Sequence, residues 1–304
     1  MVQMASTTNR AQGRGHTPWP PEAYYSGEHP LLETCFLHLP GVGPRFVEKL
    51  QQSGILTWND ALNMPLPCGR VKADALRVGL EESRERLERG DAVWFSNILP
   101  PAEQWRLFPH FRHTAAYVDI ETTGLAWDCH ITTVALYDGQ RVRTYVQGEN
   151  LEAFADDILE YSLLVTWNGR GFDAPILRRS LMIPLDKGDM AHLDLLPVFR
   201  KLDLRGGLKK VEKTLGISRD AVDGVDGLMA VRLWHAYERT GDRRFLETLL
   251  AYNAADVLSL EYLAAYAVMR HTGTPMRDMD VAGVRGELNP HSADPGVLRR
   301  MGLY

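Results

Sequence analysis

The sequence has few of the features that mark membrane-spanning or disulfide-stabilised proteins. It contains three cysteines in 304 residues, Cys35, Cys68 and Cys129, which are far apart and odd in number. They predict neither a disulfide framework nor a zinc site and fit a reducing compartment, so we expect a cytoplasmic protein. No apolar run reaches membrane-spanning length, and residues 1–21 lack the apolar core of a signal peptide.

Basic charge is not in excess either. The chain has 34 Lys and Arg residues against 39 Asp and Glu residues, a net charge of −5. Nucleic-acid-binding proteins are often basic, so this balance weighs mildly against such a partner. Bound divalent cations would neutralise an acidic cluster, however, and phosphate contacts need only a local basic or amide-rich surface.

Composition and periodicity divide the chain into five segments. Their boundaries are marked by a Gly-, Pro- and Ser/Thr-rich start, a proline pair at 100–101, and a Gly- and Pro-containing end. We expect a disordered tail (1–28), an all-helical domain (29–97), a linker (98–109), an α/β domain (110–272) and an extended C-terminal extension (273–304).

The fourth segment alternates predicted strands and helices. Strands are predicted over 114–122, over 131–147 as a pair joined by a two-residue turn at Asp138-Gly139, and from 163 and from 191. Helices are predicted after Pro175 and over 207–216, 227–241 and 243–273. This pattern by itself predicts the α/β class.

Three short segments supply four carboxylates and one phenol. Asp119 and Glu121 lie at i and i+2 on a predicted strand, so both side chains face one side. Asp173 lies at a strand-to-helix junction, and Tyr252 and Asp256 are four residues apart on one face of a helix. Four carboxylates at one point would repel each other. Such a set indicates a cage for hard divalent cations such as Mg²⁺ or Mn²⁺, which prefer oxygen ligands.

The segments AYVDIETTGL, VTWNGRGFDAPIL and LLAYNAADVLSL together resemble the motifs of the DEDD superfamily of 3′→5′ exonucleases. The resemblance covers residues 110–270. It is closest to the tyrosine subtype, DEDDy, as in B-family DNA polymerase exonuclease domains and YprB-like bacterial proteins. The sister subtype has a histidine five residues before its final Asp, where this chain has Ala251. The resemblance implies a ribonuclease-H-like fold, with a mixed central sheet flanked by helices.

The same resemblance implies a role for each motif residue. Asp119 would bridge two Mg²⁺ or Mn²⁺ ions, Glu121 and Asp256 would complete the site of the ion that holds the attacking water, and Asp173 would ligate the second. Two cations so placed can activate a water and stabilise the leaving oxygen. Tyr252 would orient the water. The residues expected to contact the substrate are Asn168, Thr122, Leu125 and Lys209.

Each of these residues also has a plainer explanation. Asp119 and Glu121 could lie on an exposed strand face, although a buried apolar strand rarely carries two acids on one face without a function. Asp173 could cap the helix that follows it. Tyr252 could be a core residue, and Asp256 a solvated one. The order and spacing of the three motifs favour the catalytic interpretation.

For three neighbouring sets of residues, a structural explanation is favoured over a role in the site. Lys209 and Lys210 are expected on a solvated helix face more than at a phosphate. Asp194 is expected to cap the helix after it rather than act with His192 as an extra ligand. Two aromatic residues are expected in the core more than as base-stacking platforms: Trp167 and Phe172.

Residues 31–62 resemble a helix-hairpin-helix module, with LPGVGPRFVEKL as the diagnostic part. Leu39 to Gly43 would form the hairpin, and Pro44 would begin the second helix. Backbone N–H groups at such a helix start bind phosphate without distinguishing sequences. Packing against the α/β domain is the alternative. The residues expected to contact the DNA backbone are Gly41, Val42, Gly43, Arg45 and Lys49.

These features give three hypotheses for function. The first is a metal-dependent 3′→5′ exonuclease that acts on single-stranded DNA ends in repair or end processing, while the hairpin holds duplex or junction backbone. The second is an exoribonuclease, since a ribonuclease-H-like fold does not decide between DNA and RNA. The third is a non-catalytic DNA-binding adapter. The complete motif set disfavours the adapter, and the hairpin favours DNA.

Overall fold

The computed structural model describes residues 31–126, 128–185, 188–219, 222, 224–273 and 288–303. The predicted tail (1–28) lies outside these residues. The helices are α1 (Pro44–Gln52), α2 (Trp58–Asn63), α3 (Arg70–Glu88), α4 (Ala92–Ile98), α5 (Leu107–Phe111), α6 (Ala153–Asp157), α7 (Asp173–Leu181), α8 (Leu195–Lys201), α9 (Leu208–Thr214), α10 (Gly227–Thr240), α11 (Arg243–Thr272) and α13 (Pro295–Arg300), with 3₁₀ turns η2 (Pro101–Arg106), η3 (Arg112–Thr114) and η4 (Ile158–Glu160).

Five strands form one mixed sheet in the order β3-β2-β1-β4-β5. The strands are β1 (Ala115–Thr122), β2 (Ile131–Tyr137), β3 (Val142–Val146), β4 (Leu163–Thr166) and β5 (Ala191–Asp194). The central β1 pairs antiparallel with β2 and parallel with β4. Together with the flanking helices, this arrangement confirms the predicted α/β class with a mixed central sheet.

The connection between β2 and β3 is longer than the predicted two-residue turn. Tyr137 pairs with Val142, so four residues join the strands. The Asp138 carboxylate accepts hydrogen bonds from the backbone N–H groups of Gln140 and Arg141, at 3.0 and 2.9 Å. This side-chain turn competes with the tighter hairpin that Asp-Gly pairs favour.

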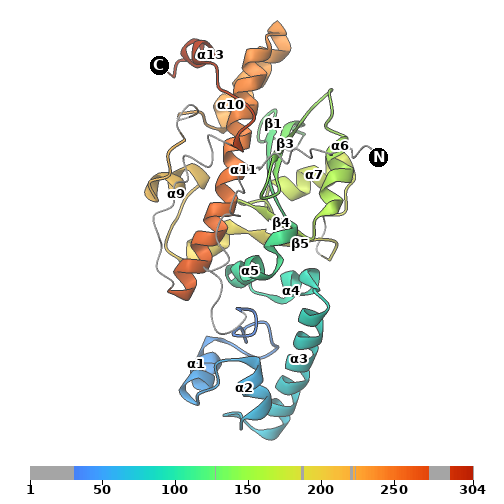
Figure 1. Cartoon of the computed structure of the whole chain (residues 1–304), viewed down its shortest axis with the longest axis vertical. Coiled ribbons are helices and arrows are strands. Elements are labelled where there is room, and N and C mark those ends of the chain that lie inside the picture. The colour runs from blue at the N-terminus through green and yellow to red at the C-terminus, as the bar shows by residue number, and fades with distance from the viewer. Residues whose placement is uncertain are drawn as a thin grey trace, which may run out of the picture.

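Helices cover both faces of the sheet (Figure 1). The apolar side chains of β1 alternate between two core clusters. One lies under α6 and α7 and contains Val118, and the other contains Tyr117 together with α11 side chains such as Val257. None of the helices in the described ranges is long and apolar enough to cross a membrane.

Residues 98–109, predicted as a linker, are folded and packed. They include η2 and the start of α5, and Trp105 and Phe108 are buried. Both side chains belong to the same apolar cluster as Leu32 and Val268. The helical N-terminal part and the α/β part therefore share one core, and a domain boundary at this segment stays a prediction.

The predicted extended C-terminal tail is wrong for residues 288–303, which pack against α11. Val297 and Leu298 of α13 are buried, and Asn289 Nδ2 donates to the Ala251 carbonyl oxygen at 2.9 Å. A helix of six residues is too short to give a clear apolar period in the sequence. Residues 274–287 lie outside the described part of the chain.

The N-terminal part is helical from α1 onward, but residues 31–43 form turns, so the all-helical prediction is wrong there. Their backbone bonds run from Cys35 to Leu32 and from Leu39 to Phe36. Pro40 disfavours helical backbone at the residue before it, which limits any helix in this stretch. The first helix of the predicted hairpin module is therefore missing from the described residues, while the second begins at Pro44 as predicted.

Glu261 is a buried acid of α11, less than two helical turns after Asp256. Burial raises its pKa from 4.5 to about 8, although the Tyr137 hydroxyl hydrogen-bonds to it. Because the pKa is raised on folding, the native state loses stability as pH rises from about 4.5 towards 8. Glu261→Gln should therefore raise the melting temperature by several degrees at pH 8 and change it little at pH 4.5. Equal shifts at both pH values in thermal denaturation would contradict this.

Candidate active site

The central strand β1 carries two acids on the sheet face that α11 covers. Val118 and Ile120 point into the cluster under α6 and α7. Tyr117 points to the opposite face, and Asp119 and Glu121 continue its alternation. Since β1 is flanked on both sides by other strands, both carboxylates lie at the middle of the sheet.

Helix α11 brings the third acid to the same place. One oxygen each from Asp119, Glu121 and Asp256 lie within 4.8 Å of one another. Glu121 and Asp256 are buried, and Asp119 is half-buried. The predicted pairing of a strand Asp-x-Glu with a helical Asp is thus present as a compact group of three carboxylates.

Asp173 approaches the cluster from the start of α7. Its carboxylate accepts a hydrogen bond from the Ile120 backbone N–H at 3.2 Å, which ties it to β1 between the two strand acids. Phe172 occupies the cap position of α7, and Asp173 is the first helical residue, so it does not act as the predicted N-cap alternative. Burial raises the pKa of Asp173 to about 7, and its hydrogen bond to Ile120 opposes that rise.

The pKa values of the two acids on β1, Asp119 and Glu121, are both raised well above their ordinary values. Burial, followed by the charges of Asp256 and Asp173, raises the pKa of Asp119 well above its ordinary value. Burial and Asp256 do the same for Glu121, while Lys209 opposes the rise. Four clustered carboxylates with only oxygen donors are the ligand set that Mg²⁺ and Mn²⁺ prefer, so these residues fit divalent cations.

Tyr252 lies one helical turn before Asp256 and is buried against the cluster. Burial, then the charges of Asp256 and Glu121, raises the pKa of its phenol well above 10. Its ring also lies 4.2 Å from Lys209 Nζ. The phenol therefore stays protonated at neutral pH and is able to donate a hydrogen bond beside the carboxylates.

Asn253 is a site residue that sequence reasoning missed. It is fully buried, and its Nδ2 donates to Asp119 Oδ2 at 2.8 Å and to the Asp119 carbonyl oxygen at 3.2 Å. Thr133 of β2 donates to Asn253 Oδ1 at 3.0 Å, which fixes the amide orientation. The available signal was a lone amide next to Tyr252 in a long apolar helix.

Comparison with known proteins agrees with this fold. Residues 116–268, half of the chain, match the family described as RNase_H superfamily. The chain belongs to the RNase_H superfamily. Among solved structures, the family B DNA polymerase from the hyperthermophilic archaeon Pyrobaculum calidifontis is similar, with 17% identity and a TM-score of 0.32 over 54% of this chain and 30% of that one. No curated protein matches the chain.

The predicted substrate contacts of this RNase_H superfamily protein differ in accessibility. Thr122 is buried, and its hydroxyl donates to the Gly124 carbonyl oxygen at 2.7 Å. Leu125 is 88% exposed on the loop after β1. Asn168 is exposed in a left-handed conformation with φ of 63°. Contact with substrate by any of these residues stays a prediction.

Lys209 is not on the solvated helix face that was the favoured expectation. Its Nζ donates to the Val225 carbonyl oxygen at 2.6 Å and contacts the Tyr252 ring. Burial lowers its pKa, and the charge of Asp256 opposes that effect. The positively charged Lys209 side chain therefore lies at the edge of the acidic cluster, whereas Lys210 is exposed.

Asp194 organises the loop that precedes Asp173. It caps α8 by accepting from the Leu196 N–H at 3.0 Å, which confirms the capping prediction. It also accepts from the backbone N–H groups of Asn168 and Arg170, at 2.8 and 3.2 Å. Trp167 and Phe172 pack against the core clusters, as predicted.

Within the same loop, Gly169 has no room for a side chain. An added Cβ would lie 2.2 Å from Thr166 Oγ1. The Thr166 hydroxyl in turn accepts from the Gly169 N–H at 3.2 Å and hydrogen-bonds to His192 at 2.8 Å. Glycine therefore lets the backbone turn tightly after β4 and bring Asp173 back to the sheet.

The predicted hairpin residues lie at the start of α1, except Lys49, which is in its last turn. Gly41, Arg45 and Lys49 are exposed, and Gly43 is half-buried. Lys72 of α3 donates to the Gly41 carbonyl oxygen at 3.0 Å and lies over the Phe46 ring. The Val42 side chain is instead part of the apolar core, so only its backbone could face a phosphate.

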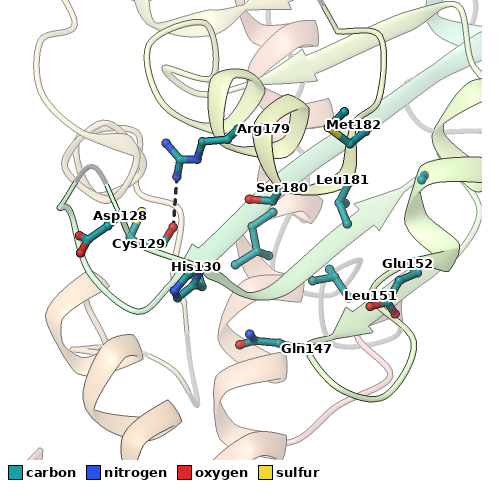
Figure 2. Close-up of a pocket in the computed structure, with 12 residues that line it drawn as sticks. Asp128, Cys129, His130, Gln147, Leu151, Glu152, Arg179, Ser180, Leu181 and Met182 are labelled. Carbon is teal, nitrogen blue, oxygen red and sulfur yellow. Dashed lines mark hydrogen bonds between the residues drawn. The ribbon is translucent and has the colours of Figure 1, made fainter.

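A pocket of about 640 Å³ lies away from the acids, beside α6 and α7 (Figure 2). Its wall includes Ile131 and Leu151, which belong to the core cluster on the opposite sheet face from Asp119. Arg179 closes one side by donating to the Cys129 carbonyl oxygen at 3.1 Å. Its lining includes none of the predicted site residues.

Proposed function

We propose that this protein is a divalent-metal-dependent 3′→5′ exonuclease of the tyrosine subtype, acting on single-stranded DNA ends. The observation that carries the proposal is the convergence of Asp119, Glu121 and Asp256 within 4.8 Å, with Asp173 bonded to the same strand. Membership of the RNase_H superfamily supports a nuclease. The DEDDy assignment and the direction of attack rest on the resemblance of the three motifs.

The four carboxylates would hold two Mg²⁺ or Mn²⁺ ions. When bound, such a pair activates a water and stabilises the leaving 3′ oxygen of a phosphodiester. Hydrogen bonds within the chain hold two of these carboxylates in place. Asn253 orients Asp119, and the Ile120 N–H orients Asp173. Fixed ligands lower the reorganisation needed during the reaction.

Tyr252 would act on the attacking water. Its phenol is neutral, because burial and the nearby carboxylates raise its pKa, so it would position the water by hydrogen bonding rather than remove its proton. Lys209, beside the ring, supplies positive charge close to where a substrate phosphate would lie.

The N-terminal part, residues 29–97, would act as a helix-hairpin-helix domain that binds DNA backbone next to the exonuclease domain (110–272). Gly41, which is exposed, and Gly43, which is half-buried, lie at the start of α1 near Arg45 and Lys72, and they support this role together with Lys49 in the last turn of α1. Backbone binding would place a single-stranded 3′ end near the carboxylates without regard to sequence. DNA repair or end processing in the cytoplasm is the process that such an activity would serve.

Replacing both Gly41 and Gly43 by Val should weaken binding to all DNA sequences by the same factor, about tenfold or more. Gly41 has φ of +72°, where a β-branched residue is strained, and open space surrounds both positions. The variant would therefore distort and cover the helix start without disturbing the core. Fluorescence anisotropy on several oligonucleotides measures this.

Gly54→Val is the matched control for that variant. Gly54 has φ of +76° and open space as well, but it follows the opposite end of α1. It should suffer similar strain and keep its affinity for DNA. A loss that depends on sequence in the double variant, or an equal loss in the control, would argue against backbone binding at the hairpin.

Two matched single strands, one DNA and one RNA, each labelled at its 3′ end, test the substrate and the direction. The proposal expects immediate release of a labelled mononucleotide from DNA, and slower release from RNA. Faster degradation of RNA would favour the exoribonuclease. Binding without release from either strand would favour the adapter, and labelled fragments longer than a mononucleotide would contradict 3′→5′ attack.

A further inference from the structure

Asp256 belongs to a buried network of ion pairs that also contains Arg219 and Glu212. Arg219, in the segment after α9, is ion-paired with both Asp256 and Glu212. Its Nη1 donates to Asp256 Oδ1, while its Nε donates to Glu212 Oε2 at 2.6 Å and its Nη2 lies 2.5 Å from the same oxygen. One guanidinium thus joins an acid of α9 to an acid of α11.

Glu212 anchors this guanidinium firmly. It is 1% exposed, and its second oxygen accepts a hydrogen bond from the Ser259 hydroxyl. Ser259 lies on α11, three residues after Asp256. The network therefore starts on α11, passes through Glu212 and Arg219, and returns to α11 at Asp256, so it fixes Asp256 relative to its own helix.

We propose that Arg219 is a positioning residue, which aligns the Asp256 carboxylate for cation binding through its bond to Glu212. This inference rests on the proposed function, since it takes Asp256 as a metal ligand. Groups that hydrogen-bond a ligating carboxylate fix its orientation, and losing one weakens metal binding by about 10–100-fold. The Arg219 side chain is only 6% exposed and its donors face two carboxylates, which fits internal alignment rather than contact with a substrate phosphate.

Two variants test whether Arg219 aligns the Asp256 carboxylate or only balances its negative charge. Arg219→Lys keeps the charge, but one ammonium cannot replace the fork of donors that faces both carboxylates. Glu212→Gln keeps the shape and the acceptor for Ser259 but removes the anchoring charge. Arg106→Lys is the control, because Arg106 is also mostly buried and ion-paired with an acid, Glu103, outside the cluster.

The test is a Mn²⁺ titration of the full chain followed by electron paramagnetic resonance, alongside DNA affinity measured in chelator. Arg219→Lys should weaken Mn²⁺ binding by about 10–100-fold, and Glu212→Gln should weaken it in the same direction. Arg106→Lys should bind Mn²⁺ as the wild type does, and DNA affinity without metal should stay constant in every variant.

Unchanged or tighter Mn²⁺ binding in Arg219→Lys would overturn the proposal. Unchanged Mn²⁺ binding with weaker DNA binding would identify Arg219 as a substrate contact instead, which also overturns it. If the wild type binds no Mn²⁺, the proposed function and this inference are both wrong. If the wild type binds Mn²⁺ and Arg219→Lys binds it with the same affinity, only this inference is wrong.

Discussion

Asp119→Asn is expected to abolish DNA cleavage and, at the same time, to stabilise the metal-free protein. The substitution would remove a carboxylate that is proposed to hold both cations, and a loss of several kcal/mol of transition-state stabilisation lowers the rate about a thousandfold or more. Burial and three neighbouring acids raise the pKa of Asp119, so its charge opposes folding at pH 8. An asparagine carries no charge and still accepts the Asn253 hydrogen bond.

Cleavage with Mn²⁺ and thermal denaturation in chelator at pH 8 measure the two effects. Asp203→Asn is a suitable control, because Asp203 is exposed and has φ of 59°, which asparagine also tolerates. It should change neither activity nor stability. Wild-type activity in Asp119→Asn would exclude the acidic cluster as the catalytic centre.

Tyr252→Phe should lower kcat about a hundredfold while leaving Mn²⁺ affinity unchanged. Phenylalanine preserves the ring that contacts Lys209 and the packing of a residue that is 3% exposed. Only the hydroxyl beside the carboxylates is lost, so the defect should appear in the chemical step rather than in folding or metal binding. Single-turnover cleavage at saturating Mn²⁺ separates these steps.

Tyr266→Phe provides the comparison on the same helix. Tyr266 is also buried and stacks on Phe199, away from the three-carboxylate cluster. Its kcat should equal that of the wild type. If both variants lose activity equally, or Tyr252→Phe loses Mn²⁺ affinity, the water-orienting role of Tyr252 is wrong.

The sequence predicted the strand and the helix that carry most of the acids because both are apolar along their length, and β1 and α11 are buried at nearly every position. The alternation around Asp119 and the four-residue spacing of Tyr252 and Asp256 each predict a shared face, and the structure brings Asp119 and Asp256 together. A family match across residues 116–268 agrees with the predicted ribonuclease-H-like fold. The role of each residue in catalysis stays a prediction.

The supporting residues could not be predicted, since their partners are distant in the sequence. Asn253 bonds to Asp119 across 134 positions, and Arg219 reaches Asp256 across 37. No local period encodes such pairs. The packing of residues 98–109 was also missed, because a proline pair marks the start of a 3₁₀ helix as well as a linker.

The acidic cluster is proposed to use divalent cations to remove nucleotides from a 3′ end. The most direct test is incubation of the purified protein with 5′-labelled single-stranded DNA in Mg²⁺, in Mn²⁺ and in chelator. We expect a ladder of progressively shortened labelled products with either metal, and intact DNA in chelator. Intact DNA under every condition, or an identical ladder in chelator, would contradict the claim.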